Sequence, residues 1–153
     1  MQYLRGTTKT TTMRILLTVI ALTTFLFTSC DETKKVIDVA GNVQLSGAYT
    51  ITKAGTKTVA NPDINITFAA LDKSVNGNAG CNTFFGNYTL DLYALSFGAI
   101  AATEMYCDEA VMTTEREIMK AMRETGSYTL ENGVLTLLSK NDRSVLLTAK
   151  KAK

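Results

Sequence analysis

Short runs of alternating hydrophobic and polar residues fill most of the chain after about residue 45. Between Ile64 and Leu71, Ile64, Ile66 and Phe68 fall on one face, which is typical of a strand with one buried side. Glycine and asparagine separate this run from others like it. The pattern predicts strands over Leu45–Thr52, Ile64–Leu71, Asn82–Leu90, Leu95–Ile100, Ser127–Leu130, Val134–Leu138 and Ser144–Ala149.

Two asparagine–glycine stretches predict turns between these strands. Asn132-Gly133 lies between two hydrophobic runs and is a strong signal for a β-hairpin. Asn76-Gly77-Asn78 is expected to form a turn or a bulge, because both residue types tolerate a positive φ. In the strand region that follows, Phe85, Tyr88 and Leu90 are the expected core residues.

One segment has the period of a helix. Ile118, Ala121, Met122 and Thr125 form an apolar stripe, which predicts a helix over Thr114–Thr125. Thr114 and Glu117 match a capping box, and Gly126 suits the position after the helix end. The remaining face is expected to be solvated and carries Glu115, Arg116, Lys120, Arg123 and Glu124.

These elements predict an α+β, mainly β fold. About seven or eight short strands would form a curved antiparallel sheet or a small open barrel, packed with one helix. There is no regular alternation of strand and helix, so a Rossmann-type fold is not expected.

The N-terminus is predicted to be an export signal. Arg14 precedes an apolar run from Ile15 to Leu26, which is short and rich in threonine for a membrane-spanning helix. Phe27-Thr28-Ser29-Cys30 resembles the lipobox of bacterial lipoproteins, although Phe27 stands where leucine is usual. Cys30 is therefore the expected site of lipidation. An ordinary signal peptide or a membrane anchor with an incidental cysteine is the alternative.

This interpretation divides the chain into three parts. Residues 1–30 would be a lipoprotein-type signal peptide, with Met13 as a possible true start, and residues 31–44 a polar tether. Residues 45–150 would be the folded domain. The expected location is a bacterial cell envelope, where the protein would be membrane-anchored and would face the periplasm or the cell surface.

The net charge of the part after Cys30 is close to zero and does not alter the predicted fold or location. Arg5, Lys9 and Arg14 precede Cys30 without any acidic residue, so the part after Cys30 carries 13 basic and 14 acidic residues, or −1. No cluster of lysine and arginine with interleaved aromatic residues remains, and we expect no nucleic-acid partner.

The two cysteines after Cys30 form an even pair, Cys81 and Cys107. They could form a redox pair, a metal-binding pair or a structural bridge. The tight spacing of redox pairs is missing, and an oxidising compartment favours a disulfide. We therefore predict a structural disulfide between Cys81 and Cys107.

Candidate catalytic chemistry is sparse. The chain contains no histidine, which removes the usual nucleophile–base pairs and most zinc sites. Glu104, Asp108 and Glu109 form an acidic cluster, but acidic residues before a helix are expected from its dipole. Met105, Met112, Met119 and Met122 are expected to be core residues rather than copper ligands. We therefore expect no catalytic residues, no metal and no cofactor.

Several short motifs together resemble the META domain of HslJ-like heat-shock lipoproteins. They are Leu45–Tyr49, Asp63–Phe68, Gly80-Cys81-Asn82, Gly86-Asn87-Tyr88, Leu95-Ser96-Phe97 and Thr103-Glu104-Met105-Tyr106-Cys107. Tyr49 stands where the family often has tryptophan. Leu92-Tyr93-Ala94 replaces the usual glycine or asparagine turn, so a longer or bulged hairpin is expected there.

The resemblance implies a compact, curved or barrel-like β-structure packed with one helix, and no catalytic residues. Its family associations are heat induction, antibiotic tolerance and, in some parasites, virulence and secretion, rather than a reaction. The leading hypothesis is a lipid-anchored envelope protein, not an enzyme, with a protein-interaction or stress-related role. The alternative is a pilot-type carrier that binds a lipid or another small ligand. The partners would be the membrane and an envelope protein or lipid.

Overall fold

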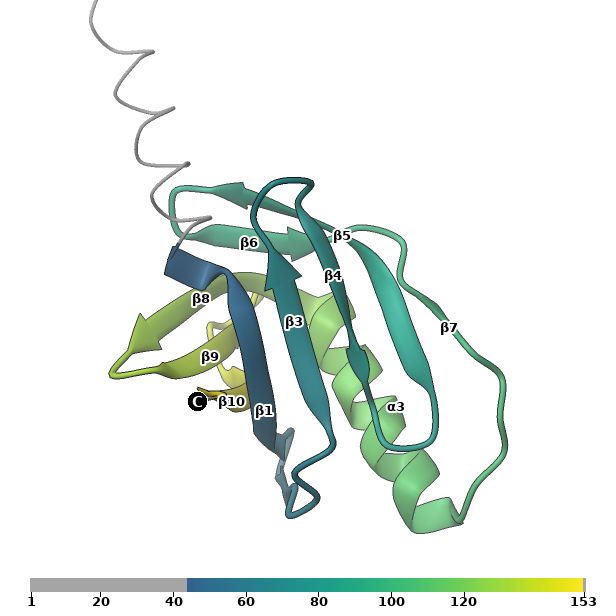
Figure 1. Cartoon of the computed structure of the whole chain (residues 1–153). Coiled ribbons are helices and arrows are strands. Elements are labelled where there is room, and N and C mark those ends of the chain that lie inside the picture. Colours follow the sequence, from purple (N-terminus) through teal and green to yellow (C-terminus); the bar gives the residue numbers. More distant parts are fainter. Residues whose placement is uncertain (1–43, 153) are drawn as a thin grey trace, which may run out of the picture. The chain divides into compact units, whose positions relative to one another are not determined.

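The computed structural model describes residues 44–152 (Figure 1). The predicted signal peptide, Cys30 and the tether up to residue 43 lie outside the described residues. In the described part of the chain no helix is long and apolar enough to cross a membrane. The strands are β1 (Gly47–Ala54), β2 (Lys57–Thr58), β3 (Asn65–Ala69), β4 (Ser74–Asn78), β5 (Thr83–Asp91), β6 (Ala94–Phe97), β7 (Ala101–Ala102), β8 (Thr125–Glu131), β9 (Val134–Ser139) and β10 (Val145–Lys151).

Eight of these strands close into an antiparallel barrel. Their order is β10-β9-β8-β6-β5-β4-β3-β1, and β1 pairs with β10 from Tyr49↔Lys151 to Ala54↔Leu147 to complete the ring. The two short strands lie outside the ring, since β2 pairs with the end of β1 and β7 with the start of β5. The α+β, mainly β prediction is confirmed, and the barrel is closed.

The helix α3 (Glu109–Glu124) packs against β1, β6, β9 and β10 (Figure 1). Its buried residues are Glu115, Ile118, Ala121 and Met122, so the predicted apolar stripe is confirmed. The predicted start at Thr114 is wrong, because the helix begins five residues earlier after the N-cap Asp108. Thr114 lies inside it and donates a hydrogen bond to the carbonyl of Ala110 (3.1 Å).

The end of the helix also differs from the prediction. The C-cap Thr125 is already extended, with φ −63° and ψ 133°, and β8 follows without a loop. Gly126 therefore belongs to β8 rather than to a helix cap. A Cβ at Gly126 would meet Lys140 at 2.5 Å, so close approach to the β9–β10 connection explains this glycine.

Aromatic rings fill the barrel. The ring of Phe68 meets those of Tyr49 and Tyr88 edge to face, with centroids 6.1 and 5.3 Å apart. Tyr88 and Leu90 are buried as predicted, but Phe85 is exposed and Phe84 is buried in its place. Side chains alternate along a strand, so Phe84, Tyr88 and Leu90 share one face of β5 and Phe85 cannot.

Three connections were predicted, with different outcomes. Asn132 and Gly133 have φ values of 51° and 74° and join β8 to β9, as expected for a type I′ turn. Asn76-Gly77-Asn78 is not a turn but the second half of β4. The β5–β6 hairpin is neither long nor bulged: Asp91 pairs with Ala94, and only Leu92 and Tyr93 form the turn.

Candidate functional site

The β4–β5 corner holds the Gly80-Cys81-Asn82 motif against the start of α3. Gly80 has a φ of +120°, and a Cβ there would lie 3.1 Å from Val111 and 3.4 Å from Ile64. The corner is closed by a hydrogen bond from the backbone N–H of Ala79 to the carbonyl of Asn82 (2.9 Å). Glycine is therefore required by both its backbone conformation and the closeness of the helix.

Asn82 is 2% exposed and uses its whole amide group. Its Oδ1 accepts hydrogen bonds from the hydroxyl of Thr103 and the backbone N–H of Met105, both at 2.7 Å. Its Nδ2 donates to the carbonyl of Met105 (3.1 Å) and to Glu115 Oε1 (2.9 Å). One buried side chain thus joins the β4–β5 corner, the chain before α3 and α3 itself.

Glu115 was predicted to lie on the solvated face of the helix, and this prediction is wrong. Its side chain is buried, and its Oε2 also accepts a hydrogen bond from the backbone N–H of Asn82 (2.9 Å). Hydrogen bonds of this kind compensate for part of the cost of burying a carboxylate. The sequence did contain a signal, because Glu115 stands three residues before Ile118 and seven before Met122.

A disulfide joins Cys81 to Cys107, with their Cα atoms 5.9 Å apart. It fixes the far end of the same segment that Asn82 holds at Thr103 and Met105. We call this arrangement of Asn82, Glu115, the disulfide and the segment Thr103–Cys107 the clamp. In residues 44–152 no group of three histidine, cysteine, aspartate or glutamate residues could hold a metal ion.

The three acidic residues near the clamp have separate roles. Asp108 is the N-cap of α3, and Glu104 is exposed. Glu109 forms an ion pair with Arg116 in the first turns of the helix. The hydrogen bond from Arg116 lowers the pKa of the Glu109 carboxyl, the opposite of what a general acid needs.

The clamp presents apolar side chains to solvent. Tyr106 is 89% exposed and Met105 is also exposed; beside them, Phe85 on β5 is exposed where it pairs with Ala101, two residues before the clamp segment. Met122 is buried and Met119 partly buried, but the prediction of a core position is wrong for Met105. Met105 is held through its backbone, which leaves its side chain free to face outward. We call Phe85, Met105 and Tyr106 the displayed residues.

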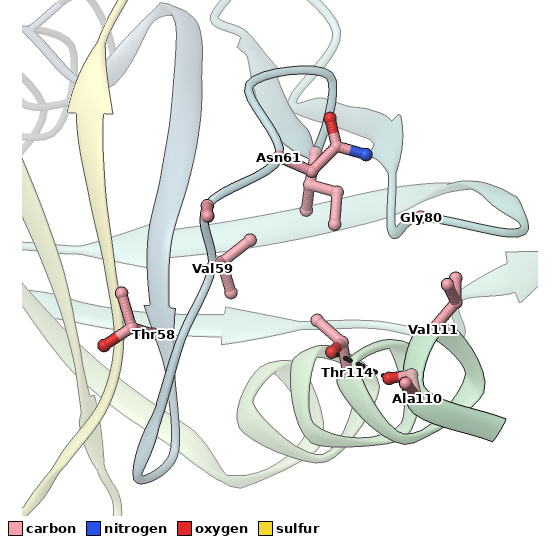
Figure 2. Close-up of a pocket in the computed structure, with 9 residues that line it drawn as sticks. Thr58, Val59, Asn61, Gly80, Ala110, Val111 and Thr114 are labelled. Atoms are coloured by element: carbon pink, nitrogen blue, oxygen red, sulfur yellow. Dashed lines mark hydrogen bonds between the residues drawn. The ribbon is translucent and has the colours of Figure 1, made fainter. Parts of the chain in front are cut away.

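A separate hollow of about 270 Å³ lies between α3 and the β2–β3 connection (Figure 2). The end of β2 contributes Thr58, the connection contributes Val59 and Asn61, and the helix contributes Val111 and Thr114. Figure 2 shows Gly80 at the side of this hollow, where no side chain narrows it. The lining is a mixture of short apolar and uncharged polar groups.

Residues 42–152 match the sequence model of the META domain. The chain belongs to the META domain family. The match agrees with the motifs that carried the resemblance and extends slightly beyond the expected range of 45–150. Among curated proteins none matches the sequence significantly.

Solved structures share the fold of this META domain. An NMR structure of a protein from Burkholderia xenovorans is 21% identical, with a TM-score of 0.61, and the match covers 75% of this chain and 88% of that one. A second NMR structure is 25% identical with a TM-score of 0.57, covering 72% and 93%. A crystal structure of a DUF4847 family protein from Bacteroides vulgatus is 16% identical with a TM-score of 0.53, covering 74% and 99%.

The structure gives a physical reason for the two motifs in this META domain. Gly80 allows the helix to approach, Cys81 is bonded to Cys107, and Asn82 holds Thr103 and Met105. The motifs therefore belong to one cluster. The sequence pointed to the cysteines but not to the Asn82–Glu115 contact, which joins residues 33 positions apart.

Proposed function

We propose that this protein is a lipid-anchored protein of a bacterial cell envelope. Cys30 would be the acylated residue, and the META domain would act as a non-enzymatic module that binds another envelope protein in a stress-related role. Support for the anchor comes from the small residues before Cys30 and the apolar run before them. The pair of cysteines after Cys30 fits an oxidising compartment.

The observation that carries the interaction role is the clamp with its displayed residues. A nearly fully exposed tyrosine is useful for recognition when its backbone is held rigid, since less conformational freedom is lost on binding. Here Met105 is hydrogen-bonded on one side of Tyr106, and Cys107 is disulfide-bonded on the other. Acidic residues lie on both sides of the segment Met105–Cys107, with Glu104 before it and Asp108 after it.

A carrier of lipid or of another small ligand is the second candidate, and the hollow beside Gly80 favours it. That hollow suits a small polar ligand better than an acyl chain, because its lining includes Thr58, Asn61 and Thr114. The barrel interior is occupied by Tyr49, Phe68 and other large side chains. We therefore place the carrier role second.

Site-specific photo-cross-linking in cells tests the interaction role. A photoreactive aromatic residue replaces Tyr106, and in the control it replaces Thr129, which is exposed on β8. We expect a discrete protein adduct from position 106 and none from position 129. Mass spectrometry of natively purified protein would show the acyl group on Cys30. A stoichiometric co-purifying small molecule, with no adduct at position 106, would favour the carrier instead.

A further inference from the structure

Two hairpin tips of the barrel expose large apolar side chains. Leu71, in the connection between β3 and β4, is fully exposed. In the two-residue turn between β5 and β6, Tyr93 is 74% exposed and Leu92 is also exposed. Such positions usually carry glycine, asparagine or other polar residues. Single exposed apolar residues are common, but here the tips of two hairpins carry them.

Both hairpin tips lie near the place where the described chain begins. Gly47, at the start of β1, pairs with Phe68 near the end of β3, three residues before Leu71. The N–H of Tyr88 donates to the carbonyl of Lys73 (2.9 Å), so β5 passes the first tip shortly before its own turn. Figure 1 shows the β3–β4 and β5–β6 hairpins on the same side of the barrel as the start of β1.

The clamp lies at the opposite end of β4 from the Leu71 tip. β4 runs from Ser74, beside the Leu71 tip, to Asn78, two residues before Gly80. A five-residue strand spans about 15 Å, so the displayed Tyr106 and the exposed tips are well separated. Within residues 44–152 the hairpin tips and the displayed residues are therefore two separate apolar regions, and the tips are the ones near residue 44.

The length of chain before the barrel limits how far this end can be from an anchor. Thirteen residues separate Cys30 from Gln44. A chain of this length reaches at most about 50 Å and averages about 20 Å as a coil. A domain of this size is itself about 30–35 Å across. At its average length the tether is shorter than the domain, so a lipid on Cys30 would on average keep the Leu71 and Tyr93 end closer to the bilayer than the clamp.

We propose that Leu71, Leu92 and Tyr93 form a shallow lipid-contact surface that orients the barrel on the membrane, with the clamp facing away. This inference rests on the lipid anchor at Cys30 in the proposed function. Tyrosine is favoured at the boundary between lipid and water, where its ring is apolar and its hydroxyl remains hydrated. Asp72, Lys73 and Asp91 flank the tips, which limits contact to the headgroup region and makes an uncharged bilayer surface the suitable one.

The positive φ of Leu92 in the β5–β6 turn also supports a lipid contact for this side chain. Leu92 has a φ of 58°, a conformation that disfavours leucine and suits glycine. A leucine at this φ carries a backbone cost that glycine would not. Contact with lipid would give the chain a reason to keep it.

Tryptophan fluorescence tests this orientation, because the chain contains no tryptophan of its own. Tyr93→Trp and Leu71→Trp each place one probe at a tip, and Tyr106→Trp places the control probe at the clamp. Each variant is purified as the mature acylated protein and inserted into phosphatidylcholine vesicles, with or without brominated acyl chains. We expect brominated lipid to quench the probes at 93 and 71 and to leave the probe at 106 unquenched. The emission of the tip probes should also shift to shorter wavelength.

The outcomes separate the two proposals. If Cys30 carries an acyl group but quenching at 93 and 71 is no greater than at 106, the lipid-contact surface is wrong and the anchor stands. Stronger quenching at 106 would mean that the opposite end meets the membrane, which also overturns the inference. A mature protein without an acyl group on Cys30 would overturn the anchor and this inference together.

Discussion

Asn82 donates and accepts hydrogen bonds at both ends of its amide group, so removing the side chain leaves several buried groups without partners. Asn82→Ala would deprive Glu115 of its side-chain donor and leave the backbone N–H of Met105 unpaired. We expect a loss of about 2–4 kcal/mol in the free energy of unfolding. Urea unfolding followed by circular dichroism measures it.

Asn87 provides the matched control for that substitution. Asn87 lies on β5, the strand that begins directly after Asn82, but it is exposed. Asn87→Ala should change the free energy of unfolding by no more than about 0.5 kcal/mol. Equal losses for the two variants would mean that the clamp contributes no more than an ordinary surface residue.

Gly77 differs from an ordinary strand residue because it has no room for a side chain. A Cβ there would collide with the carbonyl oxygen of Asn65 and lie 2.6 Å from the ring of Phe84. We expect Gly77→Ala to lower the free energy of unfolding by about 1–3 kcal/mol through overpacking. Gly98→Ala is the control, because its nearest atom would be 3.5 Å away. The measurement is the change in unfolding temperature of each variant relative to the parent. Equal changes for Gly77→Ala and Gly98→Ala would contradict the steric explanation.

The same glycine shows why residue-level prediction was incomplete. Asn76-Gly77-Asn78 has the composition of a turn, and only the closeness of a neighbouring strand reveals that the glycine is needed inside β4. Glu115 is similar, since its charge suggested solvent while its position on the helix placed it beside Asn82. In both cases a contact with a residue far away in the sequence decides the outcome.

At the scale of elements, the disulfide connects the β4–β5 corner to the segment before α3. It closes a loop between residues 26 positions apart. We expect Cys81→Ser with Cys107→Ser to lower the free energy of unfolding by about 3–4 kcal/mol, because the unfolded chain gains freedom. The measurement is urea unfolding of the double variant beside the oxidised parent. An unchanged midpoint would mean that Asn82 and Glu115 hold the segment without help.

The β5–β6 hairpin gives a prediction in the opposite direction. Leu92→Gly removes the cost of placing a leucine at a φ of 58° and should stabilise the folded protein by up to about 1 kcal/mol. Thermal unfolding measures the gain. The comparison variant is Tyr93→Gly, where the φ is not positive and the lost conformational restriction should destabilise the hairpin. A loss of stability for Leu92→Gly would show that packing of Leu92 outweighs the backbone strain.

Alternation and turn chemistry were sufficient to predict most elements. The strand near Ile64–Phe68 and the hairpin at Asn132-Gly133 were predictable because both signals are local. The start of α3 was not, because Thr114 and Glu117 imitate a capping box while the helix begins at Glu109 with no side-chain cap at Asp108. Packing of Val111 against Gly80 supports those additional turns, and a local pattern does not contain that contact.

For the whole molecule, closure of the barrel depends on pairing between β1 and β10, which are separated by almost the entire domain. The strand count and the mainly β class could be predicted, since they follow from the number of alternating runs. The closing pair could not, because β1 and β10 carry no signal for each other beyond a shared buried face. The site follows the same rule: its cysteines were visible in the sequence, while its shape comes from the closed barrel.

Buried tyrosines make the stability of the whole barrel sensitive to high pH. Burial raises the pKa of Tyr49, Tyr88 and Tyr128 above the ordinary value of 10.0. A pKa that is higher in the folded state means that the unfolded chain loses these protons first. The stability is therefore fully present below pH 10 and decreases as the pH rises toward and through the folded-state values.

Alkaline titration with two signals tests this prediction. Absorbance at the phenolate wavelength follows ionisation, and circular dichroism follows the fold. We expect the buried Tyr49, Tyr88 and Tyr128 to ionise together with unfolding. Tyr88→Phe should move the unfolding transition to higher pH, because it removes one ionisable group and only a long hydrogen bond of 3.4 Å to Ala69. Tyr106→Phe is the control and should leave the transition unchanged. If the three buried tyrosines ionised while the fold persisted, the barrel interior would have to be open to water.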